Sequence, residues 1–150
     1  IDMASTLTPT TFNVKIIEEQ VVKNNTIKNE TTFTINSVSN VDRRILTCPS
    51  ASSVDLFNLN GILPGAGTFP SSSLKYARIS NLDDTNNLAI TISGSQGRMT
   101  QEVTPKSTIL IASSNITSSI FSGTFGDDIK FVKAFAVGGN IDVDYTIVNS

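Results

Sequence analysis

Residues 141–147 read IDVDYTI, and this stretch decides the fold. Apolar and polar side chains alternate through it without a break. The apolar set is Ile141, Val143, Tyr145 and Ile147, and the polar set is Asp142, Asp144 and Thr146. A period of two residues is that of a β-strand with one buried face. The stretch therefore predicts a strand whose apolar face packs on a core.

The run just before it alternates as well. Ile129, Phe131, Phe135 and Val137 alternate with Lys130, Val132, Ala134 and Ala136. The turn-forming residues 138–140, Gly-Gly-Asn, separate the two runs. Two alternating runs joined by such residues predict a β-hairpin.

The same alternation recurs along the whole chain, and no helix-length window shows a period of about 3.6 residues. Further strands are predicted at residues 12–22, 26–38, 41–47, 54–59, 74–82, 88–93, 99–104 and 108–112. Asn24-Asn25, Asp83-Asp84 and the glycines of residues 94–97 supply turn chemistry between them. The predicted fold class is therefore all-β, an antiparallel two-sheet β-sandwich of about ten strands that is jelly-roll-like or a closely related barrel. The pattern leaves the strand order open.

The length of 150 residues is that of one domain. Ile1 and Asp2 precede Met3, which predicts that Met3 is the native start and that the first two residues are a cloning remnant. Residues 3–150 are expected to form a single β-sandwich domain with an N-terminal arm at residues 4–11.

Charge argues against two classes of partner. The formal net charge is −2 and the pI is near 5.0, whereas nucleic-acid binding normally shows a basic stripe. There is no apolar run of about 18 residues and no basic-then-apolar signal peptide. We expect no nucleic acid and no membrane as partners, and a soluble protein made in a cytoplasm.

Histidine is absent from the chain. Its absence removes Ser-His-Asp and Cys-His catalysis and every metal site that contains histidine. Mechanisms based on lysine or on paired carboxylates remain open. The expectation is a protein that is not an enzyme, with no catalytic residues and no cofactor.

Two further candidates for chemistry have simpler interpretations. Cys48 is the single cysteine, so we expect a small buried side chain rather than a zinc or redox centre. The Asp127-Asp128 and Asp142/Asp144 pairs could converge on Ca²⁺, but no glycine-spaced aspartate loop accompanies them. No metal site is predicted.

Two segments do not alternate. Residues 60–73 are too long for a tight turn and are rich in glycine and proline, which favours a functional loop. The candidate interaction residues in this loop are Ile62, Leu63, Pro64 and Phe69. The other segment, residues 113–126, is compatible with a short helical turn or an irregular strand.

Residues 75–86 read KYARISNLDDTN. This stretch resembles a KY-hRITNLDxTN pattern in virion structural proteins of tailed phages, particularly those of cyanophages. Residues 131–148, with their Gly138-Gly139 turn and DVDY strand, resemble the C-terminal hairpin of the same proteins, and Glu18-Glu19 fits their opening strand. Asn81, Asp83 and Asn86 can close the turn through hydrogen bonds from side chain to backbone, so they are predicted to define it.

The resemblance implies a virion structural protein, such as a capsid decoration protein or a component associated with the head or tail. It would be made in the host cytoplasm and located in the virion. Its partners would be copies of itself, with a trimer as the expected homo-oligomer, and other virion proteins. The alternative is a carbohydrate-binding β-sandwich module that recognises a host surface through a glycan.

Overall fold

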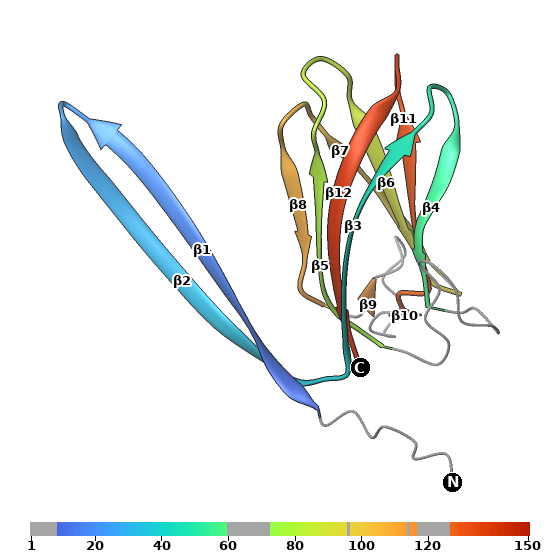
Figure 1. Cartoon of the computed structure of the whole chain (residues 1–150), viewed down its shortest axis with the longest axis horizontal. Coiled ribbons are helices and arrows are strands. Elements are labelled where there is room, and N and C mark those ends of the chain that lie inside the picture. The colour runs from blue at the N-terminus through green and yellow to red at the C-terminus, as the bar shows by residue number, and fades with distance from the viewer. Residues whose placement is uncertain (1–8, 60–72, 96, 114, 117–126) are drawn as a thin grey trace, which may run out of the picture. The chain divides into compact units, whose positions relative to one another are not determined.

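The computed structural model describes residues 9–59, 73–95, 97–113, 115–116 and 127–150 (Figure 1). Contacts between residues divide the chain into two compact units, residues 1–39 and residues 40–150. All of the secondary structure in the described residues is β-strand. The predicted fold class is confirmed at this level.

The first unit contains one β-hairpin. Its strands are β1 (Thr10–Val22) and β2 (Asn25–Val38), which pair antiparallel from the Thr10–Val38 pair to the Val22–Asn25 pair. The two residues between them, Lys23 and Asn24, have φ angles of 47° and 65°. Positive φ at both central residues is the type I′ geometry, whose twist matches that of the flanking strands.

The second unit is a sandwich of two four-stranded antiparallel sheets. One sheet has the order β4-β11-β6-β7, and the other has the order β3-β12-β5-β8. The strands are β3 (Asn40–Cys48), β4 (Ser53–Asn58), β5 (Leu74–Asn81), β6 (Leu88–Ser93), β7 (Arg98–Val103), β8 (Thr108–Ile111), β11 (Phe131–Ala136) and β12 (Ile141–Asn149). A separate small pair joins β9 (Asn115–Ile116) and β10 (Asp127–Asp128).

The strand order of the sandwich is that of a jelly roll. Counted along the chain, its first strand pairs with the eighth, the second with the seventh, the third with the sixth and the fourth with the fifth. A long hairpin that is folded over and rolled up produces these pairs. The predicted jelly-roll-like sandwich is therefore confirmed, and its two sheets contain eight of the ten described strands that have four residues or more. The other two are β1 and β2 of the hairpin.

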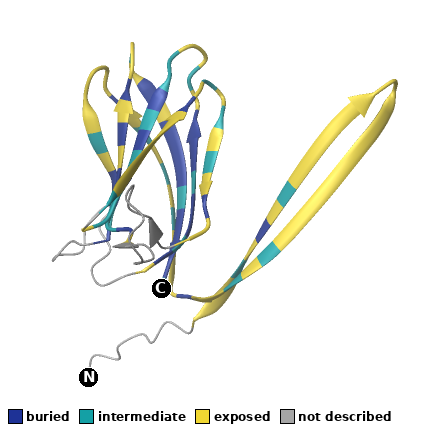
Figure 2. Ribbon diagram, turned by 180° about the vertical axis from the view of Figure 1, so that it is seen from behind, coloured by how far each residue is buried: buried dark blue, intermediate teal, exposed yellow. Residues whose placement is uncertain are grey.

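The core lies between the two sheets. Figure 2 shows buried residues on the sandwich strands, whereas most of the hairpin is exposed. The predicted inward face of β12 is confirmed, because Ile141, Val143, Tyr145 and Ile147 are completely buried. The Tyr145 ring packs on Phe57, with ring centroids 5.8 Å apart. Burying one such side chain contributes about 1.5–3 kcal/mol.

The predicted β-hairpin between the run of residues 129–137 and the run of residues 141–147 is wrong. Strand β11 pairs with β4 and β6, and β12 pairs with β3 and β5, so the two strands lie in different sheets. The Gly-Gly turn carries the chain from one sheet to the other, which local turn chemistry does not distinguish from a hairpin turn.

Strand β11 turns its smaller residues inward. Val132, Ala134 and Ala136 are completely buried, whereas Phe135 is 40% exposed. Cys48 lies beside this strand, with Sγ 3.5 Å from the Ala134 carbonyl oxygen. The expectation that Cys48 is a buried side chain is confirmed, and this burial raises the pKa of its thiol.

Candidate interaction surfaces

The turn after β5 is built around the side chain of Asn81, which is 1% exposed. Its Nδ2 donates to the carbonyl oxygens of Asn86, at 2.9 Å, and Val103, at 3.0 Å. Its Oδ1 accepts the N–H of Asp83 at 2.9 Å. One buried amide thus ties the turn to itself and to the end of β7.

Asp83 closes the second half of the turn. Its Oδ2 accepts the backbone N–H of Asn86 at 2.6 Å and that of Thr85 at 3.0 Å. These two donors, Asn86 first, hold the pKa of the Asp83 carboxyl below its usual value. The Asp83 carboxylate and the Asn81 amide both form hydrogen bonds to backbone groups of the turn. The two side chains therefore stabilise the conformation of the turn.

Asn86 joins this turn to the turn between β11 and β12. A β-carbon built on Gly138 would lie 3.0 Å from Asn86 Oδ1, and one built on Gly139 would lie 2.7 Å from Asn86 Nδ2. Gly138 also has a φ of 89°, a conformation that favours glycine. The structure therefore brings the three predicted turn residues together and places the Gly-Gly turn against one of them.

The four predicted loop residues Ile62, Leu63, Pro64 and Phe69 lie outside the described residues. Their role as an interaction loop stays a prediction.

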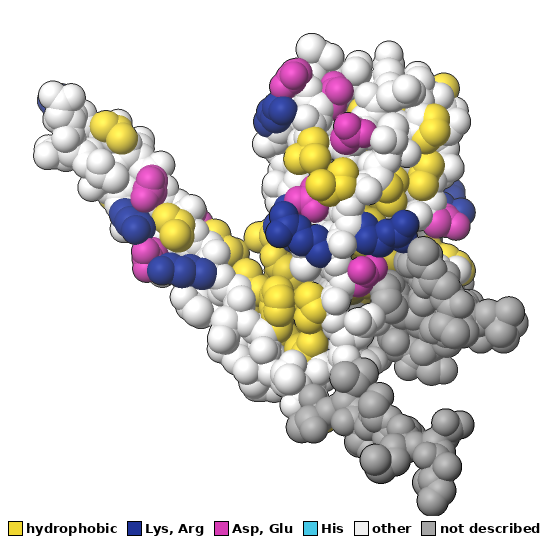
Figure 3. Space-filling view, in the orientation of Figure 1, with side chains coloured by type: hydrophobic (Ala, Val, Ile, Leu, Met, Phe, Trp, Pro, Cys, Tyr) yellow, Lys and Arg dark blue, Asp and Glu magenta, His cyan; other side chains and the backbone are white. Residues whose placement is uncertain are grey.

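The outer face of the β3-β12-β5-β8 sheet carries a cluster of charges. Asp144 Oδ2 lies 3.0 Å from Arg78 Nη2 and 3.5 Å from Arg43 Nη2. Arg78 also donates to Ser80 Oγ at 2.6 Å. Ile45, opposite Asp144 on β3, is 67% exposed. Figure 3 shows charged and hydrophobic side chains next to one another on the sandwich.

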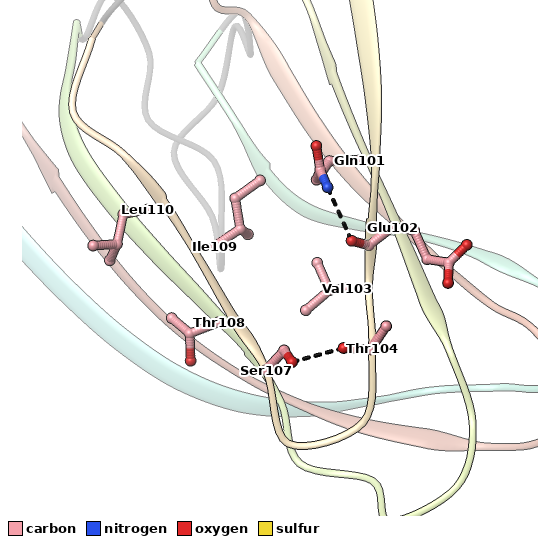
Figure 4. A pocket seen from close by; sticks show the side chains of 8 residues that line it. All are labelled: Gln101, Glu102, Val103, Thr104, Ser107, Thr108, Ile109 and Leu110. Atoms are coloured by element: carbon pink, nitrogen blue, oxygen red, sulfur yellow. Dashed lines mark hydrogen bonds between the residues drawn. The ribbon is translucent and has the colours of Figure 1, made fainter. Parts of the chain in front are cut away.

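A groove runs between β7 and β8, the edge strands of the two sheets. Near the β7–β8 turn it has a volume of about 510 Å³, and a second hollow of about 220 Å³ shares Ile109 and Leu110 with it. Figure 4 shows Val103 and Ile109 between the strands, with Thr104 and Ser107 hydrogen-bonded at the turn. Met99, in the second hollow, is 47% exposed.

The outer half of the hairpin, residues 17–32, is exposed at every position. Four of these residues are apolar, namely Ile17, Val21, Val22 and Ile27, with exposed fractions of 48%, 69%, 41% and 58%. One face carries ion pairs, in which Glu30 lies 2.9 Å from Lys28 and 3.2 Å from Lys15. The ribbon thus presents charged and apolar side chains together.

The described residues hold no group of three or more His, Cys, Asp or Glu that could bind a metal ion. They also contain no helix with the length and apolar character needed to cross a membrane.

No protein-family model, curated protein or solved structure matches this chain.

Sequence reasoning located the turn residues but neither the groove nor the exposed hairpin. One sequence signal does mark the outer half of the hairpin, since residues 17–32 contain Glu18, Glu19, Lys23, Lys28 and Glu30 among only four large apolar residues. Strands of that composition cannot fill a core. The groove has no such signal, because it depends on two sheet edges meeting in space.

Proposed function

We propose that this chain is a non-enzymatic virion structural protein, a capsid decoration protein or a component associated with the head or tail, that acts through protein–protein packing. The observation that carries the proposal is the outer half of the hairpin, a regular antiparallel ribbon of sixteen consecutive residues, two-residue turn included, in which every residue is exposed.

A two-stranded ribbon is marginally stable in water by itself. Among the described strands, β1 and β2 pair only with each other, so each has an edge that is a template for pairing with another chain. The ion pairs on one face offer little compensation, because exposed pairs contribute at most about 1 kcal/mol. Such a ribbon gains stability when a protein surface covers it, and this is the behaviour of an assembly element.

The fold is compatible with this proposal, and the sequence resemblance supports it. Jelly rolls occur in viral capsid proteins and in lectins, so the fold by itself favours neither function over the other. The resemblance of residues 75–86 to virion proteins of tailed phages favours a structural role in the virion over glycan binding. We propose copies of this chain and other virion proteins as partners, a homo-oligomer with a trimer as the expected state, and the virion as its location.

Binding of a host glycan is the rival function. Sugar platforms generally place an exposed aromatic ring beside amide groups. The β7–β8 groove contains Gln101 and Glu102, but no aromatic residue belongs to its described lining. Phe135, which is 40% exposed, lies on β11, an interior strand of its sheet and not one of the strands that form the groove. Protein packing is the better supported of the two functions.

Two measurements test the proposal. Mass spectrometry of purified particles of the virus that encodes the chain should find it in many copies per particle. Light scattering of the isolated chain after size exclusion should give a mass above that of the 16.0 kDa monomer. Absence from particles, or a monomer that binds arrayed glycans, would refute the proposal.

A further inference from the structure

We infer that the outer half of the β1–β2 hairpin of one copy binds in the groove between β7 and β8 of a second copy. The inference rests on the proposed function, and it names the partner and the two surfaces that meet.

The hairpin supplies the donor element. On β1 its outer half covers residues 17–22, in which Ile17 and Val21 face one side and Val22 faces the other. The type I′ turn at Lys23 and Asn24 keeps both strands in register to the tip. The element is thus an extended ribbon with free edges and apolar side chains available on both faces.

The groove supplies the acceptor. Strand β7 pairs only with β6, and β8 pairs only with β5, so each has one unpaired backbone edge within the described sheets. Side chains of Met99 and Ile109 lie along the opening, and Met99 is 47% exposed. Addition of an extended strand to such an edge is a common mode of recognition, in which backbone hydrogen bonds give affinity and pockets receive alternate side chains.

Length and charge match between the two surfaces. Strand β7 has six residues, and the outer half of β1 also has six, residues 17–22. Residues 17–32 contain three glutamates and two lysines, a net charge of −1. Residues 98–111 contain Arg98, Lys106 and Glu102, a net charge of +1. The contact is therefore mildly attractive, and salt should weaken it only slightly.

A second copy is the occupant that these features favour. Donor and acceptor are different surfaces of one chain, so every copy carries both. A contact between different surfaces is heterologous, and it closes into a ring when the rotation between copies allows it. Each added copy then fills one groove and offers one hairpin.

Cross-linking between two single-site variants tests the inference. One full-length variant carries Val21→Cys in the hairpin, and the other carries Met99→Cys in the groove. The matched control replaces Met99→Cys with Thr100→Cys, because Thr100 is an exposed neighbour on the opposite face of β7. All variants retain the native Cys48, which is completely buried. The wild-type chain, oxidised in the same way, measures any disulfide that Cys48 itself forms. Mixing two separately purified variants ensures that any mixed disulfide joins two copies.

After mild oxidation, the Val21→Cys and Met99→Cys pair should form several-fold more mixed dimer than the Val21→Cys and Thr100→Cys pair, because a disulfide needs close and correctly directed β-carbons. Equal yields from the two pairs in a chain that light scattering shows to be oligomeric would overturn the inference and leave the proposed function intact. A monomeric wild-type chain with no mixed dimer would overturn both.

Discussion

Asn86 and Gly139, 53 residues apart in the sequence, touch so closely that a β-carbon on the glycine would lie 2.7 Å from Asn86 Nδ2. The contact joins the turn after β5 to the turn between β11 and β12. Gly139→Ala should therefore lower the free energy of unfolding by about 1 kcal/mol, since the Asn86 side chain must move. Chemical denaturation of Gly139→Ala, Asn86→Ala and the double variant measures this.

The double variant is the critical one. If the clash is the cause, Asn86→Ala should recover part of the loss, and the two effects should not add. Strict additivity would contradict the contact. Gly138→Ala should cost more than Gly139→Ala, by about 1–2 kcal/mol, because Gly138 has a φ of 89° that an alanine adopts only with strain.

Asn81 should be the most sensitive position of its turn. Asn81→Ala leaves two carbonyl oxygens without their donor and opens space at a site that is 1% exposed, so a loss of about 2–4 kcal/mol is expected in denaturant unfolding. Asp84→Asn is the matched control, because it removes an exposed ion pair to Lys106 and should change stability by less than about 0.5 kcal/mol. Equal losses at the two positions would contradict the central role of Asn81.

Asp83 should make stability depend on acid. Its folded pKa is lowered, so its contribution is fully present above the unfolded pKa of about 3.9 and is lost as the pH falls through the folded value. Asp83→Asn should therefore melt below the wild type near neutral pH, and the difference in Tm should shrink as the pH falls below about 3.9. Thermal unfolding followed by circular dichroism from neutral to acid pH tests this. A difference that stays constant or grows on acidification would contradict it.

In the charge cluster on the outer sheet face, loss of the Asp144 side chain should destabilise the protein more than loss of the Arg43 side chain. Asp144 has a side chain that is 11% exposed and contacts Arg78, whereas the Arg43 side chain is 70% exposed. Asp144→Ala leaves Arg78 without its carboxylate and should cost about 2 kcal/mol, while Arg43→Ala should cost less than about 0.5 kcal/mol. Urea denaturation of the two variants compares these costs, and a larger loss at Arg43 would refute the assignment.

A charge at the hairpin tip should weaken assembly and leave the sandwich stable. Ile27→Lys places an ammonium group where the proposed partner covers an apolar side chain, so self-association should fall by about tenfold or more. Analytical ultracentrifugation measures the association, and thermal unfolding checks the fold. Ile45→Lys changes an apolar site on β3 that is 67% exposed, against 58% for Ile27, and should associate like the wild type. Loss of assembly in both variants would place the interface elsewhere.

Much of the local structure was predictable from particular residues. Alternation in residues 141–147 predicted the strand and its buried face, and Asn81 and Asp83 marked the turn because short polar side chains bond to nearby backbone. The hairpin was predicted as two strands near their observed bounds. Its exposure was not predicted, since the pattern shows which residues alternate and not whether a partner surface covers them.

Strand β11 shows what the alternation of residues predicts and what it leaves open. One set of alternate residues is Phe131, Lys133 and Phe135, and the other is Val132, Ala134 and Ala136. The charge of Lys133 marks the first set as the outward one, even though both sets contain apolar residues. The structure turns Ala134 and Ala136 inward, with Cys48 Sγ 3.5 Å from the Ala134 carbonyl oxygen, and leaves Phe135 40% exposed. The pattern does not show that β11 and β12 belong to different sheets, because that depends on the pairing of β11 with β4 and β6.

The sequence by itself determined the strands, the turns and the class of fold, because period-two alternation and turn chemistry are properties of neighbouring residues. Tertiary structure alone decided the jelly-roll order, the placement of β11 and β12 in different sheets, and the groove at the β7 and β8 edges. These depend on pairs such as Val148 with Val41, more than a hundred residues apart, whose contact is set by the packing of whole sheets and leaves no signature in either segment.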